Sequence, residues 1–205
     1  MLKNIGIVGN GFVGKAVKES FKKYFDVFIF DLDKIKANVE NLKELISKCK
    51  MVFLCLPTPM NLDDGSCHLG ILENTLEEIN DWCDEMEFYG LEQRTIIIKS
   101  TVPPGTTQKW NKEYKRIDIA FNPEFLTEAN SIEDFKNQNR IIIGSPRKVG
   151  AKIKSIYSKV FPKVPIIKTS STIAEMIKYF TNCFLAMKVS YANEMYQICE
   201  KLDID

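Results

Sequence analysis

The fold of this chain is decided by Ile5-Gly-Ile-Val-Gly9-Asn-Gly11-Phe-Val-Gly14. The apolar run before Gly9 predicts a buried strand, and apolar side chains at helical spacing from Phe12 to Tyr24 predict a helix. In such a unit the first glycine makes a tight turn, the second lets the backbone approach a pyrophosphate, and the third lets helix and sheet pack closely. The amides at the start of the helix then stabilise phosphate charge. The stretch predicts a dinucleotide-binding site, with a plain glycine turn as the alternative.

Asp31 ends a second predicted strand over 27–30, 20 residues after Gly11. A carboxylate at this place accepts hydrogen bonds from the ribose hydroxyls and repels a 2′-phosphate, so the predicted cofactor is NAD rather than NADP. The alternative for Asp31 is a solvated residue at a strand end. The predicted cofactor-binding residues are Gly9, Asn10, Gly11, Phe12, Val13, Gly14, Asp31, Lys36, Pro57, Thr58, Ser100, Thr101 and Glu128.

Further short apolar runs alternate with helical patterns along the chain. Such runs predict parallel strands buried on both faces. The expected fold class is α/β, a Rossmann-type, doubly wound and mostly parallel sheet over 1–170, followed by a long C-terminal helix over 171–205. The predicted strands cover 51–56, 95–98, 117–121, 140–143 and 164–168, and the predicted helices cover 41–48, 71–86, 107–114 and 149–160.

The last segment differs from the rest because it contains no Gly or Pro between Thr172 and Leu202. Thr172 and Glu175 have the spacing of a capping box, and the helix that follows approaches ~50 Å at about 1.5 Å per residue. Apolar residues cover most of its circumference between Met176 and Val189, which indicates burial on more than one side. One sheet cannot bury all of this surface, so we expect either a partner chain, in a homodimer through this helix, or a further domain that covers it.

Composition excludes several classes of protein. A net charge of +1 argues against a nucleic-acid partner, and no apolar run approaches the length of a membrane span. Six scattered cysteines without a signal peptide are typical of reduced thiols, so the expected location is cytoplasmic. The single histidine, His68, is too little for a metal site, and no metal is predicted.

Polar residues follow three of the predicted strands, in Pro57-Thr58, Ser100-Thr101 and Asn122-Pro-Glu124-Phe-Leu-Thr-Glu128. In open α/β sheets, ligands bind outside the carboxyl ends of strands. Lys178 and Asn182 lie one turn apart on the apolar last helix, which indicates a catalytic pair. The alternatives are Pro-stiffened turns, carboxylates at helix starts and a snorkelling lysine.

Taken together, these strings resemble the UDP-glucose/GDP-mannose dehydrogenase family, whose members oxidise a sugar-nucleotide alcohol to a carboxylate with two NAD. The resemblance runs from end to end of the chain. It rests on Gly9-Asn-Gly-Phe-Val-Gly14, Asp31, Pro57-Thr-Pro59, Ser100-Thr-Val-Pro-Pro-Gly105, Asn122-Pro-Glu-Phe-Leu-Thr-Glu128, Arg140-Ile-Ile-Ile-Gly144, Ala174-Glu-Met-Ile-Lys-Tyr-Phe-Thr-Asn182, Lys188 and Asn193-Glu194.

The resemblance implies a role for each polar residue. Lys178, oriented by Asn182, would stabilise the alkoxide, Glu124 would act as a general base, and Thr101 would hold the reacting hydroxyl. A nucleotide sugar, most plausibly UDP-glucose, is the implied substrate, in a step of polysaccharide biosynthesis. The implied substrate-binding residues are Glu124, Phe125, Leu126, Thr127, Glu128, Lys178 and Asn182.

Two departures from the family pattern stand out. The region between Asp31 and Met51 is shorter than usual, and the family's Gly-Phe-Gly-Gly-x-Cys string, with the UDP-binding domain that carries it, is not among these residues. Cys55 is expected inside a buried strand, so it is no substitute nucleophile. We expect the 205 residues alone to be incompetent for the full reaction. The open alternatives are a β-hydroxyacid or 6-phosphogluconate-type dehydrogenase and a non-catalytic NAD-binding dimerisation module.

Overall fold

A computed structural model describes residues 2–204, and within them the chain forms one seven-stranded sheet with helices on both faces. The strand order across the sheet is β2-β1-β3-β4-β5-β6-β7. The strands are β1 (Asn4–Val8), β2 (Asp26–Phe30), β3 (Met51–Leu54), β4 (Arg94–Ile98), β5 (Ile117–Phe121), β6 (Ile141–Gly144) and β7 (Ile166–Thr169). The predicted α/β fold with a mostly parallel sheet is confirmed.

Neighbouring strands are parallel except at one place, where β5 and β6 pair antiparallel. That pairing consists of Phe121 opposite Gly144. The central strands β3 and β4 are buried at every residue, because helices cover both faces of the sheet.

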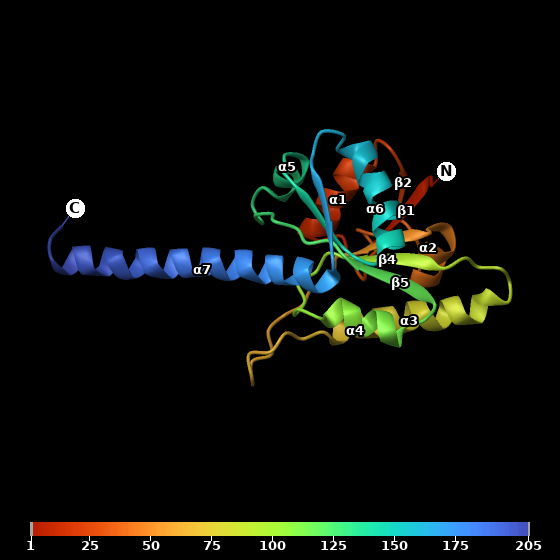
Figure 1. Ribbon diagram of the computed structural model, residues 1–205, viewed down its shortest axis with the longest axis horizontal. Coiled ribbons are helices and arrows are strands. Elements are labelled where there is room, and N and C mark those ends of the chain that lie inside the picture. The colour runs from red at the N-terminus through yellow and green to blue at the C-terminus, as the bar shows by residue number, and fades with distance from the viewer. Residues whose placement is uncertain (1, 205) are drawn as a thin grey trace.

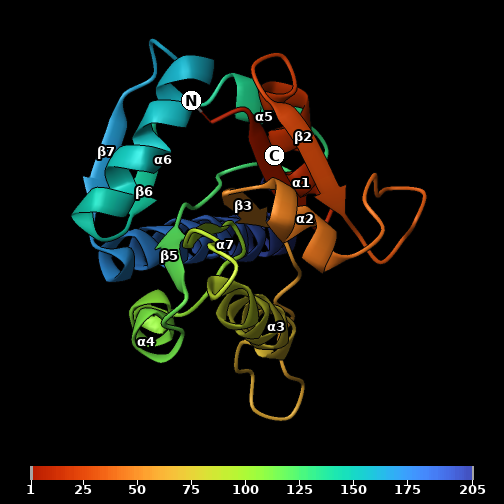
Figure 2. The same cartoon turned by 90° about the vertical axis from the view of Figure 1, so that its right-hand side faces the viewer.

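The helices divide between the two faces (Figure 2). One apolar core lies between the sheet and α2, α3 and α4, and a second lies between the sheet and α1, α5 and α6. The helices are α1 (Phe12–Phe21), α2 (Leu42–Lys48), α3 (Gly70–Glu87), α4 (Thr106–Glu113), α5 (Ser131–Lys136), α6 (Arg147–Val160) and α7 (Ser171–Lys201).

The short segment after Asp31 leaves β2 at the edge of the sheet. In the usual Rossmann order a further strand lies beyond this one. Here the side chain of Asn38 takes that place: its Oδ1 accepts from the Ile29 amide at 2.6 Å and its Nδ2 donates to the Val27 carbonyl at 2.9 Å. One asparagine therefore closes an edge that would otherwise expose unpaired backbone groups.

The long helix α7 projects away from the sheet, with its first turns packed on the domain (Figure 1). Ala174, Glu175 and Lys178 are its buried residues. The predicted capping box is wrong, because the helix begins after Ser170, whose hydroxyl accepts from the Ile173 amide at 3.3 Å. Ser170 precedes the first helical residue, so it is the one placed to cap.

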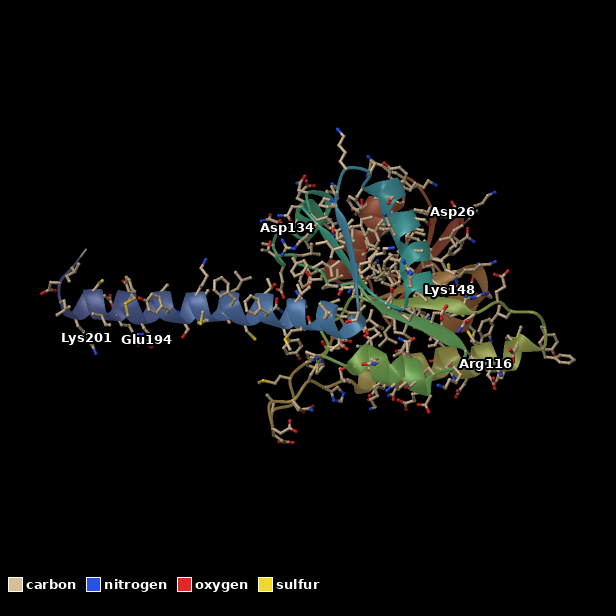
Figure 3. The ribbon with its side chains drawn as sticks, viewed as in Figure 1. Asp26, Arg116, Asp134, Lys148, Glu194 and Lys201 are labelled. Atoms are coloured by element: carbon tan, nitrogen blue, oxygen red, sulfur yellow. The ribbon has the colours of Figure 1, made fainter. Side chains whose placement is uncertain are left out.

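Beyond its first turns, α7 is surrounded by solvent in the single chain. Figure 3 shows Glu194 and Lys201 on the part of the helix that projects beyond the sheet. Phe180 is 70% exposed and Phe184 47%, although both are large apolar side chains. The burial expected from the apolar pattern is therefore not supplied by residues 2–204. No helix in that range is long and apolar enough to cross a membrane.

Candidate active site

The glycine-rich loop connects β1 to α1 at the carboxyl edge of the sheet. Gly9 has a φ of +87°, and a Cβ there would lie 2.6 Å from the Cys55 carbonyl oxygen. At Gly14 a Cβ would lie 1.9 Å from the Gly9 carbonyl oxygen. A side chain is therefore sterically excluded at both positions, which keeps the turn tight and α1 close to the sheet.

Gly11 differs from its two neighbours, because a Cβ at this position would meet no atom within 4 Å. It is the N-cap of α1 and supplies no side chain to the amides of the first turn. These amides, together with the helix dipole, are suited to bind an anion. The open space on the side where a Cβ would project from Gly11 leaves room for that anion.

A cavity of about 780 Å³ opens beside this loop. It brings together cofactor residues predicted from distant parts of the sequence, namely Asn10, Gly11, Phe12, Lys36 and Glu128, and adds Lys15 of α1, which sequence reasoning missed. The buried Oδ1 of Asn10 has no hydrogen-bond partner among the described residues. The cavity therefore combines the unpaired Asn10 Oδ1, the free amides at the start of α1, and Lys15 and Lys36. These groups fit a dinucleotide with its diphosphate.

Asp31 holds the glycine-rich loop in place. Its Oδ2 accepts from the Asn10 amide at 2.6 Å, and its Oδ1 accepts from the Asp33 amide at 2.9 Å. The Lys36 carbonyl accepts from Asn10 Nδ2 at 2.9 Å, and Lys36 Nζ lies 3.2 Å from Asp33 Oδ2. Each Asp31 oxygen retains a second lone pair, which leaves it free to accept from a ribose hydroxyl.

The loops after β3 and β4 are tied to each other by hydroxyl groups. Thr58 Oγ1 donates to the Thr101 carbonyl at 2.9 Å, and Ser100 Oγ donates to the Leu56 carbonyl at 2.5 Å. These contacts give Thr58 and Ser100 a structural role, and neither residue lines the cavity beside the glycine-rich loop. Thr101 is half-buried and its hydroxyl makes no hydrogen bond within residues 2–204, whereas Pro57 is exposed.

Lys178 and Glu124 form a shielded ion pair, although 54 residues separate them. The distance from Lys178 Nζ to Glu124 Oε1 is 2.9 Å, and their side chains are only 6% and 15% exposed. Glu124 Oε2 accepts from the Leu126 amide at 2.7 Å. The centre of the Phe125 ring lies 5.5 Å from Lys178 Nζ and 4.8 Å from Arg140 Cζ. Shielding from water strengthens the field of both charges.

The remaining predicted site residues are more exposed. Thr127 donates from its amide and its hydroxyl to Asp134 Oδ2, at 2.8 Å and 2.6 Å, and these bonds lower the pKa of Asp134. This links the loop to the start of α5. Asn182 lies one turn beyond Lys178 but is exposed and makes no hydrogen bond in the described part of the chain.

A buried lysine behind the ion pair was missed from the sequence. Lys99 is 2% exposed, and its Nζ donates to Asn122 Oδ1 at 3.0 Å. Burial lowers the pKa of Lys99 to about 8. The available signal was its position next to Ser100, directly after the apolar run Ile96–Ile98 of β4.

Cys55 lies one residue past the end of β3, not inside the strand as the sequence predicted. The residue is partly exposed, but burial of its thiol raises the pKa to about 12, so it carries no thiolate at neutral pH. Cysteine, histidine and carboxylate side chains within residues 2–204 form no group of three or more that could hold a metal.

The fold and the glycine-rich loop define a dinucleotide-binding α/β domain of the kind that dehydrogenases use. A family model described as the UDP-glucose/GDP-mannose dehydrogenase family, NAD binding domain, matches residues 36–161, and the family's central-domain model matches 172–205. The chain belongs to the UDP-glucose/GDP-mannose dehydrogenase family. It carries that family's NAD-binding domain, and its cofactor is NAD.

Individual relatives agree with this assignment. UDP-glucose 6-dehydrogenase AglM of Haloferax volcanii is 29% identical over 243 residues, covering 98% of this chain and 55% of the relative. The aligned length exceeds 205 residues, so the relative has residues that this chain lacks. A ternary complex of GDP-mannose dehydrogenase from Pseudomonas aeruginosa is similar at a TM-score of 0.83 and 25% identity, covering 98% of this chain and 54% of that one.

A UDP-glucose dehydrogenase from Pyrobaculum islandicum shares the fold over the whole of this chain and 55% of its own, with a TM-score of 0.87 and 24% identity. The chain thus spans about half the length of these three relatives.

Proposed function

We propose that this chain is the NAD-binding part of a nucleotide-sugar dehydrogenase of the UDP-glucose 6-dehydrogenase type, which oxidises an alcohol to a carboxylate with two NAD. The shielded ion pair of Lys178 with Glu124, at the same edge of the sheet as the glycine-rich loop, supports this most strongly. The proposed substrate class is that of the relative AglM, a UDP-glucose 6-dehydrogenase, and the product would serve polysaccharide biosynthesis.

Bound NAD would accept a hydride from the sugar alcohol. Lys178 is then suited to stabilise the alkoxide oxygen, because a shielded ammonium acts in a low-dielectric environment. Glu124 is suited to act as a general base, since the Leu126 amide fixes one of its oxygens while the other faces Lys178. The unengaged hydroxyl of Thr101 is available to hold the reacting hydroxyl group.

In this proposal residues 1–170 are the NAD-binding domain, and residues 171–205 are the segment whose helix α7 pairs two chains into a homodimer. The exposed apolar residues of α7 support the homodimer. All six cysteines are free, which agrees with a cytoplasmic location. The other residues proposed to contact the substrate are Phe125, Leu126, Thr127 and Glu128 of the loop after β5, and Asn182 of α7.

The test is calorimetric titration with NAD, followed by UDP-glucose while NADH is monitored. The 205-residue polypeptide should bind NAD, and any first-step NADH should vanish in Lys178→Ala but persist in Lys188→Ala, which changes an exposed lysine of the same helix. Failure to bind NAD, or tighter binding of NADP, would overturn the proposal. Sustained turnover that yields two NADH per sugar from these 205 residues would contradict the expectation that they are incompetent for the full reaction.

A further inference from the structure

Lys99 at the carboxyl end of β4 has no role in the chemistry proposed above. Its ammonium lies in the interior, where Nζ donates to Asn122 Oδ1 at 3.0 Å and sits 5.3 Å from the centre of the Phe135 ring. It has no salt-bridge partner among residues 2–204. An ammonium buried without a counterion is costly, and an uncharged side chain of similar length would fill the same space without that cost.

Asn122 joins Lys99 by hydrogen bonds to β6 and α6. Its Oδ1 also accepts from the Tyr157 hydroxyl, and its Nδ2 donates to the Ile142 carbonyl at 2.7 Å. The asparagine is therefore fixed on three sides, and Glu124 follows it by two residues.

The groups that face Lys99 come from every neighbouring element. They are Cys55 after β3, Glu124 after β5, Tyr157 of α6 and Lys178 of α7, while α5 contributes only the apolar ring of Phe135. The charges of Lys178 and Glu124 cancel within their pair. Ionised Lys99 is therefore a buried positive charge beside this pair that has no counterion of its own among residues 2–204.

We propose, building on the proposed function, that Lys99 is a positioning residue that supplies the excess positive charge at the reacting oxygen. It acts through Asn122 and the Lys178–Glu124 pair and does not touch the substrate. A charge held in a site shielded from water acts over several ångströms. Because burial lowers the pKa of Lys99 to about 8, this charge is present at neutral pH and is lost above pH 8.

The experiment uses D-glucuronate as the probe, because its C6 carboxylate resembles the anionic oxygen that the site is proposed to hold. Binding is followed by NMR on the NAD-loaded chain with ¹³C-labelled lysine. Lys99→Met should weaken glucuronate about tenfold at pH 7. Tyr157→Phe removes an uncharged donor to the same Asn122 oxygen and should leave the affinity nearly unchanged. The lysine resonance that disappears in Lys99→Met is assigned to Lys99. In the parent chain this resonance should titrate with a midpoint near pH 8.

The unsubstituted chain at pH 9 provides a test that needs no variant, since it should bind glucuronate more weakly than at pH 7. Equal affinity in parent and Lys99→Met overturns the proposal, as does an equal loss in Tyr157→Phe, which would indicate a structural network. A Lys99 signal that does not titrate between pH 7 and pH 9 overturns it as well. None of these measurements requires turnover, so they fail or succeed independently of NADH formation from UDP-glucose.

Discussion

Glu175, the fully buried carboxylate of α7, accepts a hydrogen bond from the Thr107 amide at 2.8 Å, across 68 residues of chain. Its second oxygen accepts from the Gly105 amide at 2.6 Å. Both amides belong to the start of α4, so the carboxylate compensates the positive end of that helix. This bond fixes the root of α7, and with it the position of Lys178 one turn later.

Replacing Glu175 by Gln should lower the free energy of unfolding by about 1–3 kcal/mol, because a neutral amide replaces a charge that accepts two buried hydrogen bonds. Denaturant unfolding measures the change. Glu194→Gln, on the exposed part of the same helix, is the control and should be neutral. Equal stability of the two variants would show that the buried cap contributes nothing.

Gly11→Ala should separate cofactor binding from stability. The added methyl group meets no protein atom, so unfolding should change by less than about 1 kcal/mol, whereas NAD should bind at least tenfold more weakly. Gly14→Ala is the contrasting variant, because its methyl group collides with the Gly9 carbonyl and should destabilise the domain. Undiminished NAD affinity in Gly11→Ala would exclude this loop as the diphosphate site.

Asp31→Ala should weaken NAD binding by about 1–3 kcal/mol, since it removes a charged acceptor and releases the Asn10 amide. Isothermal titration calorimetry gives the affinity. Asp33→Ala removes a neighbouring exposed carboxylate and should cost much less. The assignment fails if the two variants bind NAD equally well, or if the parent prefers NADP.

Self-association should depend on the exposed apolar face of α7. Phe180→Glu and Phe184→Glu should convert a dimer at micromolar concentration into a folded monomer, because these rings contact solvent in the single chain. Sedimentation velocity measures the mass and circular dichroism the fold. A parent chain that sediments as a monomer would contradict the proposed homodimer.

Lys99 should give the domain a distinctive dependence of stability on pH. An unfolded lysine keeps its proton up to about pH 10.4, whereas folded Lys99 loses it near pH 8, so the unfolded state binds more protons and stability rises with pH in this window. The destabilisation caused by burying the charged Lys99 is fully present below pH 8. Relative to Lys99→Met, the parent should gain about 1 kcal/mol between pH 7 and pH 9. Parallel stability curves for the two proteins would exclude a titrating buried lysine.

The alternation of strands and helices could be predicted because it depends on local periodicity. Buried runs such as 51–54 have no other stable place than the middle of a parallel sheet. The glycine spacing likewise defines its own turn, as the collisions at Gly9 and Gly14 show. These are properties of short segments, and sequence carries them directly.

Long-range contacts were harder to predict. Glu175 was assigned to the start of its own helix, but it caps α4, because nothing local indicates which amides it faces. Lys99 was passed over because the sequence does not tell whether a lysine at a strand end turns inward or outward. The role of Asn38 at the edge of β2 could not be predicted either, because the path of the chain determines which backbone groups its side chain meets.

The single antiparallel contact of Phe121 with Gly144 divides the sheet into two parallel blocks. A Cβ at Gly144 would lie 2.6 Å from the Ala174 side chain and 2.7 Å from the Ser171 Cα, so the root of α7 rests directly on this junction. A force applied to the far end of α7 by any bound partner is therefore transmitted to the seam between the blocks. Asn122 bridges that seam, because it donates to the Ile142 carbonyl on one side and accepts from Lys99 on the other.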